Sequence, residues 1–499
     1  MVNAASTDWC GTGERYRNAT PISMLPDDVL LEIFDFCQEN DDDSHGWLVW
    51  EWHLLVHVCQ RWRQIIFASP HRLNLRIFCT PGTPVRENLG IWPPLPIVIK
   101  YQHSDPEYTI APGDEDNVIA ALEHPDLIRY LGLDVTDSQL GNFATAMQEP
   151  YPVLTYLDIT SLGRNALVLP TDFLGGSAPC LRTIDLWGIP FPALPTLLLS
   201  ASDLVFLFLH DIPPTGYVSP EAMGACLSAL PRLESFVIEF QLATPRPDRM
   251  RLPPATRAVL PALKIFVFQG ASEYLEDLVV QIDSPQLDTV RIYCLNQLVD
   301  FQVTRLSKFI DRSLGLKLTP FQHAVVYFCN SLVSFGVHHH ANHPAQHRCP
   351  AETAINCKGI DWQVSHMAQV LSQLSPTLSI VNHLTLHAEP EDPPLEGTDD
   401  VEWPHLLHQF SAVTTLHVSH KLARHVALAL ENITGGIFAE ALPSLDCIYL
   451  EGQPASSIEK FVAIRQLSGR TVTVIDTEEE FEDTLLSYIK EQEEDDDDE

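Results

Sequence analysis

Residues 152–159 read PVLTYLDI, residues 179–186 read PCLRTIDL and residues 231–238 read PRLESFVI. All three follow one pattern: a proline, a leucine two positions later, and apolar residues at the sixth and eighth positions. The pattern starts seven times in the chain, at Pro152, Pro179, Pro192, Pro231, Pro261, Pro285 and Pro443. The composition predicts roughly one copy by chance, so the pattern indicates a structural repeat. The copy at Pro192 falls outside the spacing of its neighbours and does not belong to the series.

Five further copies lack the proline but keep the apolar core, and these copies support the repeat through their spacing. They begin at Ile128, Leu204, Leu332, Val381 and Val413. From residue 128 to residue 287, the first core positions of successive copies lie 23 to 30 residues apart, and beyond that they lie 32 to 49 residues apart. Units of this length and core are typical of leucine-rich repeats, in which each unit supplies one short strand and a helical or irregular return. Such units bury their apolar edges against their neighbours and stack into a curved solenoid.

The segments between the copies fit helical returns. Ser219 followed by Pro220 is a helix start with a hydroxyl cap and a proline in the first turn. Residues 361–374 form another amphipathic stretch. We therefore predict an irregular α/β leucine-rich-repeat solenoid over residues 121–476, with an insertion around residues 338–360. The alternative is an undivided α/β domain whose Pro-Leu boundaries coincide by chance.

Residues 21–70 follow a helical pattern instead. Leu30, Ile33, Phe34 and Cys37 lie at i, i+3, i+4 and i+7, which is one stripe of a helix that Pro26 opens. A second stripe consists of Leu54, Leu55, Val58, Cys59, Trp62, Ile65 and Ile66. We predict a small helical module here, between a flexible arm at residues 1–20 and a connecting segment at residues 71–120, so the fold class is α+β overall. A module this small buries little surface alone, so it is either a cap on the solenoid or a docking module that a partner completes.

The runs MLPDDVLLEIFDFC (residues 24–37) and WHLLVHVCQRWRQIIFASP (residues 52–70) resemble the F-box motif, a module of three helices. The resemblance rests on the Leu-Pro start and on the Trp-Arg pair at the end. Two features depart from the family: the connection between the two runs is longer than the usual F-box turn, and Cys37 stands where leucine is more common. Residues 71–99 look like the segment that follows the F-box in the expanded F-box families of mushroom-forming fungi.

This resemblance implies a substrate receptor of an SCF-type cullin–RING ubiquitin ligase, whose F-box docks the adaptor subunit and, through it, a cullin. The residues that would form or support the adaptor-binding surface are Leu25, Pro26, Val29, Ile33, Val58, Cys59 and Trp62. The solenoid would hold a protein substrate close to the ubiquitin-conjugating enzyme, which raises the effective concentration of the substrate. The alternative is a leucine-rich-repeat interaction scaffold that is not linked to ubiquitination.

The side chains between the core positions of each strand are expected on the concave face, because successive side chains of a strand point to opposite faces. We expect the protein substrate on this face. The candidate substrate-binding residues are Tyr156, Asp158, Asp185, Trp187, Phe206, Phe208, His210, Arg291, Tyr293 and His417. Aromatic side chains suit the anchors of a protein interface, and the acids favour a basic ligand. A register slip of one residue would turn each of these side chains to the other face.

The charge of the chain argues against two classes of partner. Thirty Lys and Arg stand against 66 Asp and Glu, a formal charge of -36, so neither nucleic acid nor an anionic membrane surface is expected as a partner. Part of this charge lies in an acidic tail at residues 477–499, which we expect to be a disordered, solubilising end; the alternative is that it competes for a basic partner surface. The most apolar stretch, residues 194–209, is interrupted by polar residues and proline, so no membrane span is expected. Eleven cysteines without a CxxC pair, and a start without a secretory signal, favour the cytoplasm or the nucleus.

No catalytic motif is present in the sequence. The chain has no GxxxxGK[ST], GxSxG or HExxH sequence, so we predict a non-catalytic subunit without a cofactor. The most metal-like feature is the run HHHANHPAQHRC at residues 338–349, but its spacing is not that of a closed zinc site. We therefore interpret this run as a solvated insertion loop and predict no metal.

Overall fold

The structure is a computed structural model. It describes residues 22–36, 52–101, 110–163, 167–242, 257–295, 303–313, 321–338, 351–357, 360–388, 403–434, 442–451, 458–467 and 469–477. The predicted arm at residues 1–20, most of the His-rich run and nearly all of the acidic tail lie outside these residues.

Three α-helices follow a single 3-10 turn, η1 (Ile22–Met24), in the N-terminal module. The helices are α1 (Asp27–Phe36), α2 (Trp52–Val58) and α3 (Gln60–Ala68). Asp27 and Asp28 lie in the first turn of α1, where the helix dipole favours negative charge. Leu30 and Phe34 of α1 and Ile66 of α3 are buried and form the core of the module.

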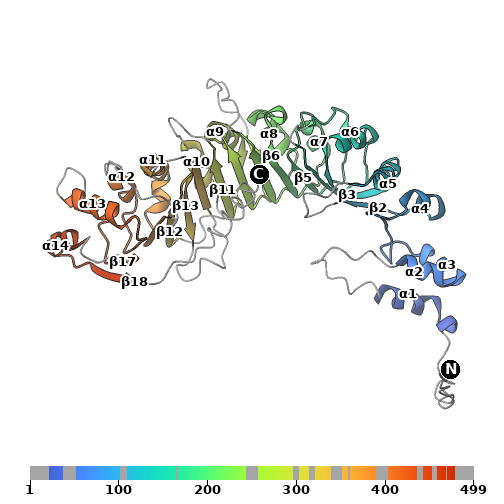
Figure 1. The fold of residues 1–499 in the computed structure, drawn as a ribbon, viewed down its shortest axis with the longest axis horizontal. Helices are drawn as coiled ribbons and strands as arrows, with labels where there is room; N and C mark the ends of the chain where they lie inside the picture. Colours follow the sequence, from blue (N-terminus) through green and yellow to red (C-terminus); the bar gives the residue numbers. More distant parts are fainter. Residues whose placement is uncertain are drawn as a thin grey trace, which may run out of the picture.

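One long sheet dominates the remainder of the described chain, and it holds sixteen strands (Figure 1). In spatial order these are β1 (Ile77–Cys79), β2 (Ile97–Tyr101), β3 (Ile128–Val135), β4 (Tyr156–Ser161), β5 (Thr183–Trp187), β6 (Phe206–Ile212), β7 (Ser235–Phe240), β9 (Ile265–Gly270), β11 (Thr289–Cys294), β14 (Ala351–Asn356), β13 (Leu332–His338), β12 (His323–Phe328), β15 (His383–Ala388), β16 (Thr415–Val418), β17 (Cys447–Glu451) and β18 (Thr473–Thr477). Neighbouring strands are parallel except where β13 pairs with β12 and β14. A separate parallel pair consists of β8 (Ala258–Val259) and β10 (Ile282–Asp283).

Helices lie along one side of this sheet, which bends into an arch with the helices on its outer, convex side (Figure 1). They are α4 (Val85–Ile91), α5 (Pro112–Leu122), α6 (Asp137–Ala146), α7 (Leu194–Ser200), α8 (Pro220–Leu227), α9 (Ser272–Gln281), α10 (Thr304–Arg312), α11 (Ile360–Leu378), α12 (Trp403–Leu407), α13 (Ala423–Thr434), α14 (Glu459–Leu467) and the 3-10 turns η3 (Phe173–Gly176) and η4 (Pro214–Gly216). The prediction of an α/β repeat solenoid is therefore confirmed. The Pro192 copy precedes α7 rather than a strand, which agrees with its irregular spacing.

The repeated proline has a local structural reason. In the copy at 152, the amide of Leu154 donates to the carbonyl of Tyr151, so Pro152 is the second residue of a four-residue turn that leads into β4. The same bond, at 3.2–3.4 Å, recurs before the strands that follow Pro179, Pro231, Pro261, Pro285 and Pro443. Proline suits this position because its fixed φ matches the turn. In these six copies, the Pro-x-Leu pattern is thus the turn that leads into a strand.

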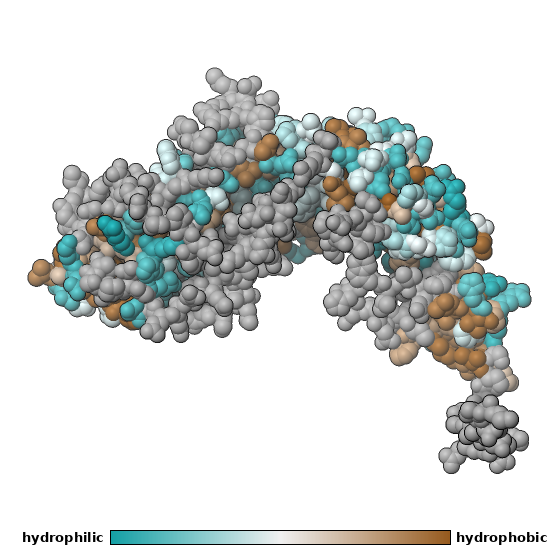
Figure 2. All heavy atoms as spheres, in the orientation of Figure 1, coloured by the Kyte–Doolittle hydropathy of each residue, from teal (hydrophilic) through white to brown (hydrophobic). Residues whose placement is uncertain are grey.

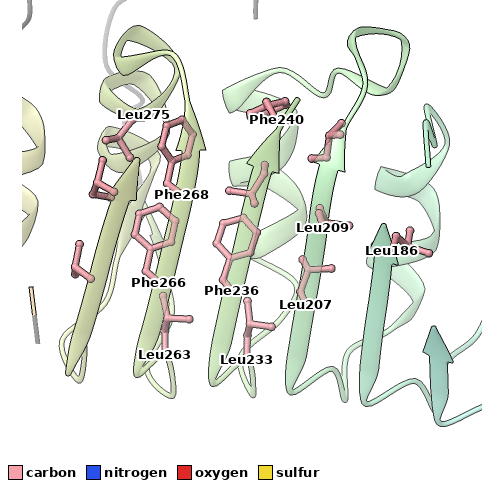
Figure 3. Close-up of a cluster of buried hydrophobic side chains, with 14 of the residues drawn as sticks. Leu186, Leu207, Leu209, Leu233, Phe236, Phe240, Leu263, Phe266, Phe268 and Leu275 are labelled. Atoms are coloured by element: carbon pink, nitrogen blue, oxygen red, sulfur yellow. The ribbon is translucent and has the colours of Figure 1, made fainter. Parts of the chain in front are cut away.

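The repeated leucine and the two later apolar positions form the core between sheet and helices. The leucines at 154, 181, 204, 233, 263 and 287 have no exposed surface. Figure 3 shows Leu233 and Leu263 in one row, just before the neighbouring strands β7 and β9. Phe236 and Phe266 form the next row on these strands, with ring centroids 5.6 Å apart. Burial of each such side chain stabilises the fold by about 1.5–3 kcal/mol. Each unit therefore depends on its neighbours, as expected of a solenoid.

A row of backbone hydrogen bonds just before the strands also joins consecutive units. The residue after each repeated leucine donates its amide to the equivalent carbonyl of the preceding unit, at 2.8–2.9 Å. This row runs through Thr155, Arg182, Val205, Glu234, Lys264 and Asp288. It fixes the register from unit to unit, so positions that are equivalent in sequence lie side by side on the sheet.

The middle of the sheet departs from the regular repeat. The copy that begins at Leu332 falls on β13, which runs antiparallel to both of its neighbours. Only residues 329–331 separate β12 from β13, and so short a connection can join only antiparallel strands. The predicted insertion at 338–360 includes β14, which returns to pair in parallel with β11. The long spacing in the sequence thus corresponds to a three-stranded meander placed within the solenoid.

The N-terminal end of the sheet lies within residues 71–120, for which the sequence predicts a connecting segment. The pairs β1–β2 and β2–β3 are both parallel, and Ile77, Ile97 and Ile99 are buried. The sheet thus begins directly after the helical module.

Candidate protein-binding surface

The register of β4, β5 and β6 brings the candidate substrate-binding residues into rows on one face. Tyr156, Thr183 and Phe206 are register partners in the first row. Asp158, Asp185 and Phe208 form the second row, and Thr160, Trp187 and His210 form the third. The residues between them, such as Leu157, Ile184 and Leu207, are buried against the helices. These rows therefore lie on the concave face; we call this area the β4–β7 patch, because Glu239 of β7 extends it.

The candidate residues divide into a compact group and three distant positions. Seven of them, from Tyr156 to His210, lie together on β4, β5 and β6. Arg291 and Tyr293 lie on β11, with β7 and β9 between them and the patch. His417 lies on β16, beyond the antiparallel meander. The structure brings together the first group only.

Aromatic rings cover much of the β4–β7 patch. The rings of Trp187 and His210 stack with centroids 4.8 Å apart, and Phe208 lies 6.0 Å from Phe206 and 6.1 Å from His210. Trp187 is 49% exposed and Phe206 is 40% exposed. Large apolar side chains exposed on one concave surface are typical of protein interfaces.

One aromatic residue of this area was absent from the candidate residues. Tyr130 of β3 stacks on Tyr156 with centroids 4.4 Å apart and an angle of 4° between the planes. The repeat pattern points to Tyr130 as well, because Tyr130 lies two positions after Ile128 just as Tyr156 lies two positions after Leu154. Burial and the neighbouring Asp158 raise the pKa of Tyr156 to about 12. Its phenol therefore stays neutral and donates to Oδ2 of Asp158 at 3.4 Å.

His210 lies between two carboxylates. Its Nδ1 is 2.7 Å from Oε2 of Glu239, and its Nε2 is 4.0 Å from Oδ1 of Asp185. Burial lowers the pKa of His210, but the hydrogen bond to Glu239 and the charges of Glu239 and Asp185 outweigh this effect, so its pKa is raised. Burial also raises the pKa of Asp185. The protonated imidazole thus balances part of the negative charge of the patch.

A backbone irregularity positions this histidine. Leu209 pairs with Ile238 and Ile212 pairs with Phe240, so β6 carries one residue more than β7 at this point. Asp211, inside this bulge, has a positive φ of 50°, a conformation that Asp tolerates better than most residues. β-bulges change the direction of side chains at the end of a strand. The bulge lies at the C-terminal end of β6, where His210 contacts Trp187 of β5 and Glu239 of β7.

The three distant candidates have different surroundings. Nε of Arg291 lies 3.8 Å from Oε2 of Glu352, which is almost fully buried. The ring of His417 stacks on Tyr449 with centroids 4.3 Å apart, and burial together with the neighbouring His383 lowers the pKa of His417. Tyr293 lies next to Gln269 of β9 in register.

The candidate adaptor-binding residues divide by exposure. Val29 and Val58 are 41% and 58% exposed, and Pro26 and Cys59 are exposed as well. Leu25, Ile33 and Trp62 are half-buried. Cys59 also has a structural role as the N-cap of α3, where its Sγ accepts from the amide of Trp62 at 3.5 Å.

Exposed apolar residues are concentrated on this module. Those of α1, α2 and the preceding turn are Ile22, Met24, Val29, Phe36, Leu54 and Val58. Figure 2 shows hydrophobic residues gathered over the module, at the lower right of the view. Arg61 of α3 connects the Leu-Pro start to this helix, since its Nη2 donates to the carbonyl of Leu25 at 2.6 Å and to Oδ1 of Asp27 at 2.5 Å.

Two other kinds of site are not found in the described part of the chain. Among these residues, no group of three or more His, Cys, Asp and Glu side chains could hold a metal ion. Of the His-rich run, His338 is the last residue of β13, and the residues that follow lie outside the described ones. None of the described helices combines the length and the apolar character that crossing a bilayer requires.

Comparison with known proteins adds little to this geometry. No family model matches the chain, so the F-box resemblance of residues 22–70 stays a prediction. The search of curated proteins gave no match either. Among solved structures, the chain is similar to the leucine-rich repeat-containing protein LegL7 from Legionella pneumophila, with 12% identity, a TM-score of 0.27, and coverage of 80% of this chain and 98% of that one. The strand order, the turns and the stacked core described above identify the C-terminal part as an α/β repeat solenoid.

Proposed function

We propose that the protein is a substrate receptor of an SCF-type cullin–RING ubiquitin ligase. In this proposal, the helical module docks the adaptor subunit and the solenoid holds a protein substrate. The observation that carries the proposal is the exposed apolar surface of a three-helix module whose sequence resembles an F-box. A small module that exposes Val29, Phe36, Leu54 and Val58 to water gains stability when a partner covers them.

The arrangement of the two parts fits a receptor. The module precedes β1 at one end of the arch, and the β4–β7 patch lies further along the concave face (Figure 1). A solenoid whose units share one sheet and one core is a stiff spacer. A stiff spacer keeps the substrate at a set distance from the adaptor, which converts an encounter between free molecules into one within a complex.

Co-elution with the SCF adaptor subunit tests the proposal. The purified full-length protein is expected to form a stable complex with the adaptor in size-exclusion chromatography. A Val29→Asp/Val58→Asp variant is expected to lose this complex, because each change places a charge in the apolar contact. A Leu25→Ala/Pro26→Ala variant tests the start of the motif in the same way, with circular dichroism as the check on folding.

The matched control is Val259→Asp on β8, a valine that is 57% exposed and lies far from the module in the sequence. This variant is expected to bind the adaptor like the unmodified protein. If the intact protein forms no complex with the adaptor, the ligase proposal is wrong. The second candidate function, a repeat scaffold outside ubiquitination, would then stand, and it rests on the β4–β7 patch alone.

A further inference from the structure

We propose that the β4–β7 patch binds an extended segment of a protein substrate in which an arginine or lysine lies next to an apolar residue. This inference deepens the proposed function, since it names the class of substrate that the receptor recognises. The inference also applies if the protein is a repeat scaffold outside ubiquitination, because it depends on the concave face and not on the helical module.

The negative charge of the patch favours a ligand with a positive charge. Strands β4, β5, β6 and β7 contain four carboxylates, Asp158, Asp185, Asp211 and Glu239, and neither lysine nor arginine. Their only basic side chain is His210. A cationic side chain therefore meets attraction from several strands at once, whereas an acidic segment, a nucleic acid or an anionic membrane is repelled.

The aromatic side chains of the patch favour a ligand that has a flat cationic group and an apolar side chain. Trp187 and Phe206 are half-exposed, and the face of an aromatic ring attracts a cation. Trp187 follows Asp185 by two positions on β5, and Phe206 lies in the row next to the one that holds Asp158 and Asp185. A guanidinium stacks on such a face while its N–H groups bond a neighbouring carboxylate. An apolar neighbour in the same segment covers the second ring and removes it from water.

His210 makes this recognition dependent on pH. The charged groups around it are Asp185 from β5, Glu239 from β7 and Asp158 from β4, and the rings of Trp187 and Phe208 are uncharged. When His210 is protonated, its single positive charge offsets part of the negative charge of Glu239 and Asp185. When His210 loses its proton, the charges of both carboxylates are no longer offset, and they attract an incoming cation more strongly. The affinity for a basic segment is therefore expected to rise with pH through the raised pKa of His210.

Pools of nine-residue peptides test the proposal with the immobilised full-length protein. The central residue is arginine, lysine, citrulline or glutamate, and the flanking positions hold equal mixtures of uncharged residues without histidine. The arginine and lysine pools are expected to be retained at least about fivefold more than the citrulline pool, which has the shape of arginine without its charge. Equal retention of the arginine and citrulline pools, or no retention of any pool, would overturn the proposal.

A variant separates the patch from the general acidity of the chain. Asp185→Asn/Glu239→Gln removes only two of the 66 acidic residues and is expected to abolish the preference for arginine over citrulline. The control Asp203→Asn removes a carboxylate from the turn before β6, where Asp203 is paired with Arg232 on the surface, and is expected to keep the preference. If both variants keep it, the retention reflects net charge and the proposed site is wrong.

Two further measurements complete the test. Retention of the arginine pool is expected to rise between about pH 6 and pH 8.5, and His210→Gln is expected to remove this rise; a rise that persists in the variant would contradict the role of His210. The Asp185→Asn/Glu239→Gln variant is expected to co-elute with the adaptor unchanged. If the intact protein does not bind the adaptor, only the ligase proposal is contradicted. If the intact protein shows no preference for arginine over citrulline, only this inference is contradicted.

Discussion

The rings of Phe34 in α1 and Trp62 in α3 meet edge to face, with centroids 4.8 Å apart and planes at 62°. Phe34 is almost fully buried, and Trp62 is half-buried beside it. This pair connects the two sequence runs that carry the F-box resemblance, which are separated by residues outside the described ones. Trp62 therefore has a structural role in the module in addition to its proposed role in adaptor binding.

We expect Phe34→Ala to unfold the helical module and leave the solenoid folded. The loss of a buried aromatic ring costs about 3–5 kcal/mol, which is comparable to the whole stability of so small a unit. Limited proteolysis with mass spectrometry should show new cleavage within residues 22–70 and an intact fragment that begins near β1. Phe36→Ala, which removes a 67% exposed ring from the same helix, serves as the control and should leave the cleavage pattern unchanged.

The regular part of the fold could be predicted from the sequence, because its signal is local. Each Pro-x-Leu marks a turn closed by a single backbone bond, and the apolar positions that follow show which side chains of the next strand are buried. The same alternation places Asp185, Trp187 and Phe208 on the concave face. These features depend on residues within eight positions of one another.

The meander and the contact of His210 with Glu239 could not be predicted, because they depend on pairing between distant segments. All six residues of β12 are buried, so this strand shows no alternation and no Pro-x-Leu start. The parallel pairing of β12 with β15 joins residues 60 positions apart, as in His323 with His383. The contact of His210 with Glu239 likewise depends on one extra residue in β6, and the sequence contains no proline or glycine at that bulge.

Gly224→Ala is expected to destabilise the solenoid by about 1–3 kcal/mol. A Cβ at Gly224 in α8 would lie 2.7 Å from Cβ of Gln281 at the end of α9, and this contact is closer than two such atoms approach. Rotation of a side chain cannot relieve it, because Cβ of Gln281 is attached to the backbone. The two helices must therefore move apart, and the midpoint of urea unfolding should fall.

The matched control for this change is Gly90→Ala in α4. A Cβ at Gly90 meets no atom within 4 Å, so the gain in helix propensity, up to about 1 kcal/mol, acts unopposed. The two Gly→Ala variants should thus shift the urea midpoint in opposite directions. A neutral result for Gly224→Ala would mean that α8 and α9 are not packed as closely as the structure shows.

Glu276 of α9 takes the place of the missing helix cap of α10. The residue before α10, Val303, offers no capping side chain, and the Glu276 carboxylate accepts from the amides of Arg305 and Leu306 at 2.8 Å each. We expect Glu276→Ala to cost about 1–3 kcal/mol, because it leaves the buried amide of Leu306 and the partly buried amide of Arg305 without an acceptor. Hydrogen exchange should be faster at these two amides in the variant.

The neighbouring Asp277 provides a control for Glu276. Its carboxylate forms an ion pair with Nη1 of Arg305 at 2.5 Å near the surface, and such pairs are worth at most about 1 kcal/mol. Asp277→Ala should therefore leave the exchange of the Leu306 amide close to that of the unmodified protein. Equal acceleration in both variants would show that the carboxylate of Glu276 is not the cap of α10.

The stability of the solenoid is expected to fall as the pH drops below about 6.5, because of buried histidines around β12. Burial, and then the neighbouring His338, His383 and His417, lower the pKa of His323 to about 3. The folded protein thus keeps His323 neutral while the unfolded chain takes up a proton below its ordinary pKa of about 6.5, so the loss accumulates between pH 6.5 and pH 3. At pH 5 this difference amounts to about 2 kcal/mol for one such group.

Urea unfolding at pH 7 and pH 5 measures this loss. His323→Gln keeps a polar group within reach of Thr385 Oγ1, which lies 2.8 Å from Nε2 of the histidine, and should reduce the difference between the two midpoints. His405→Gln, which removes an exposed histidine from α12, should retain the difference of the unmodified protein. If His323→Gln lowers stability equally at both pH values, the acid sensitivity arises from other groups, and the neutral state of His323 makes no contribution to it.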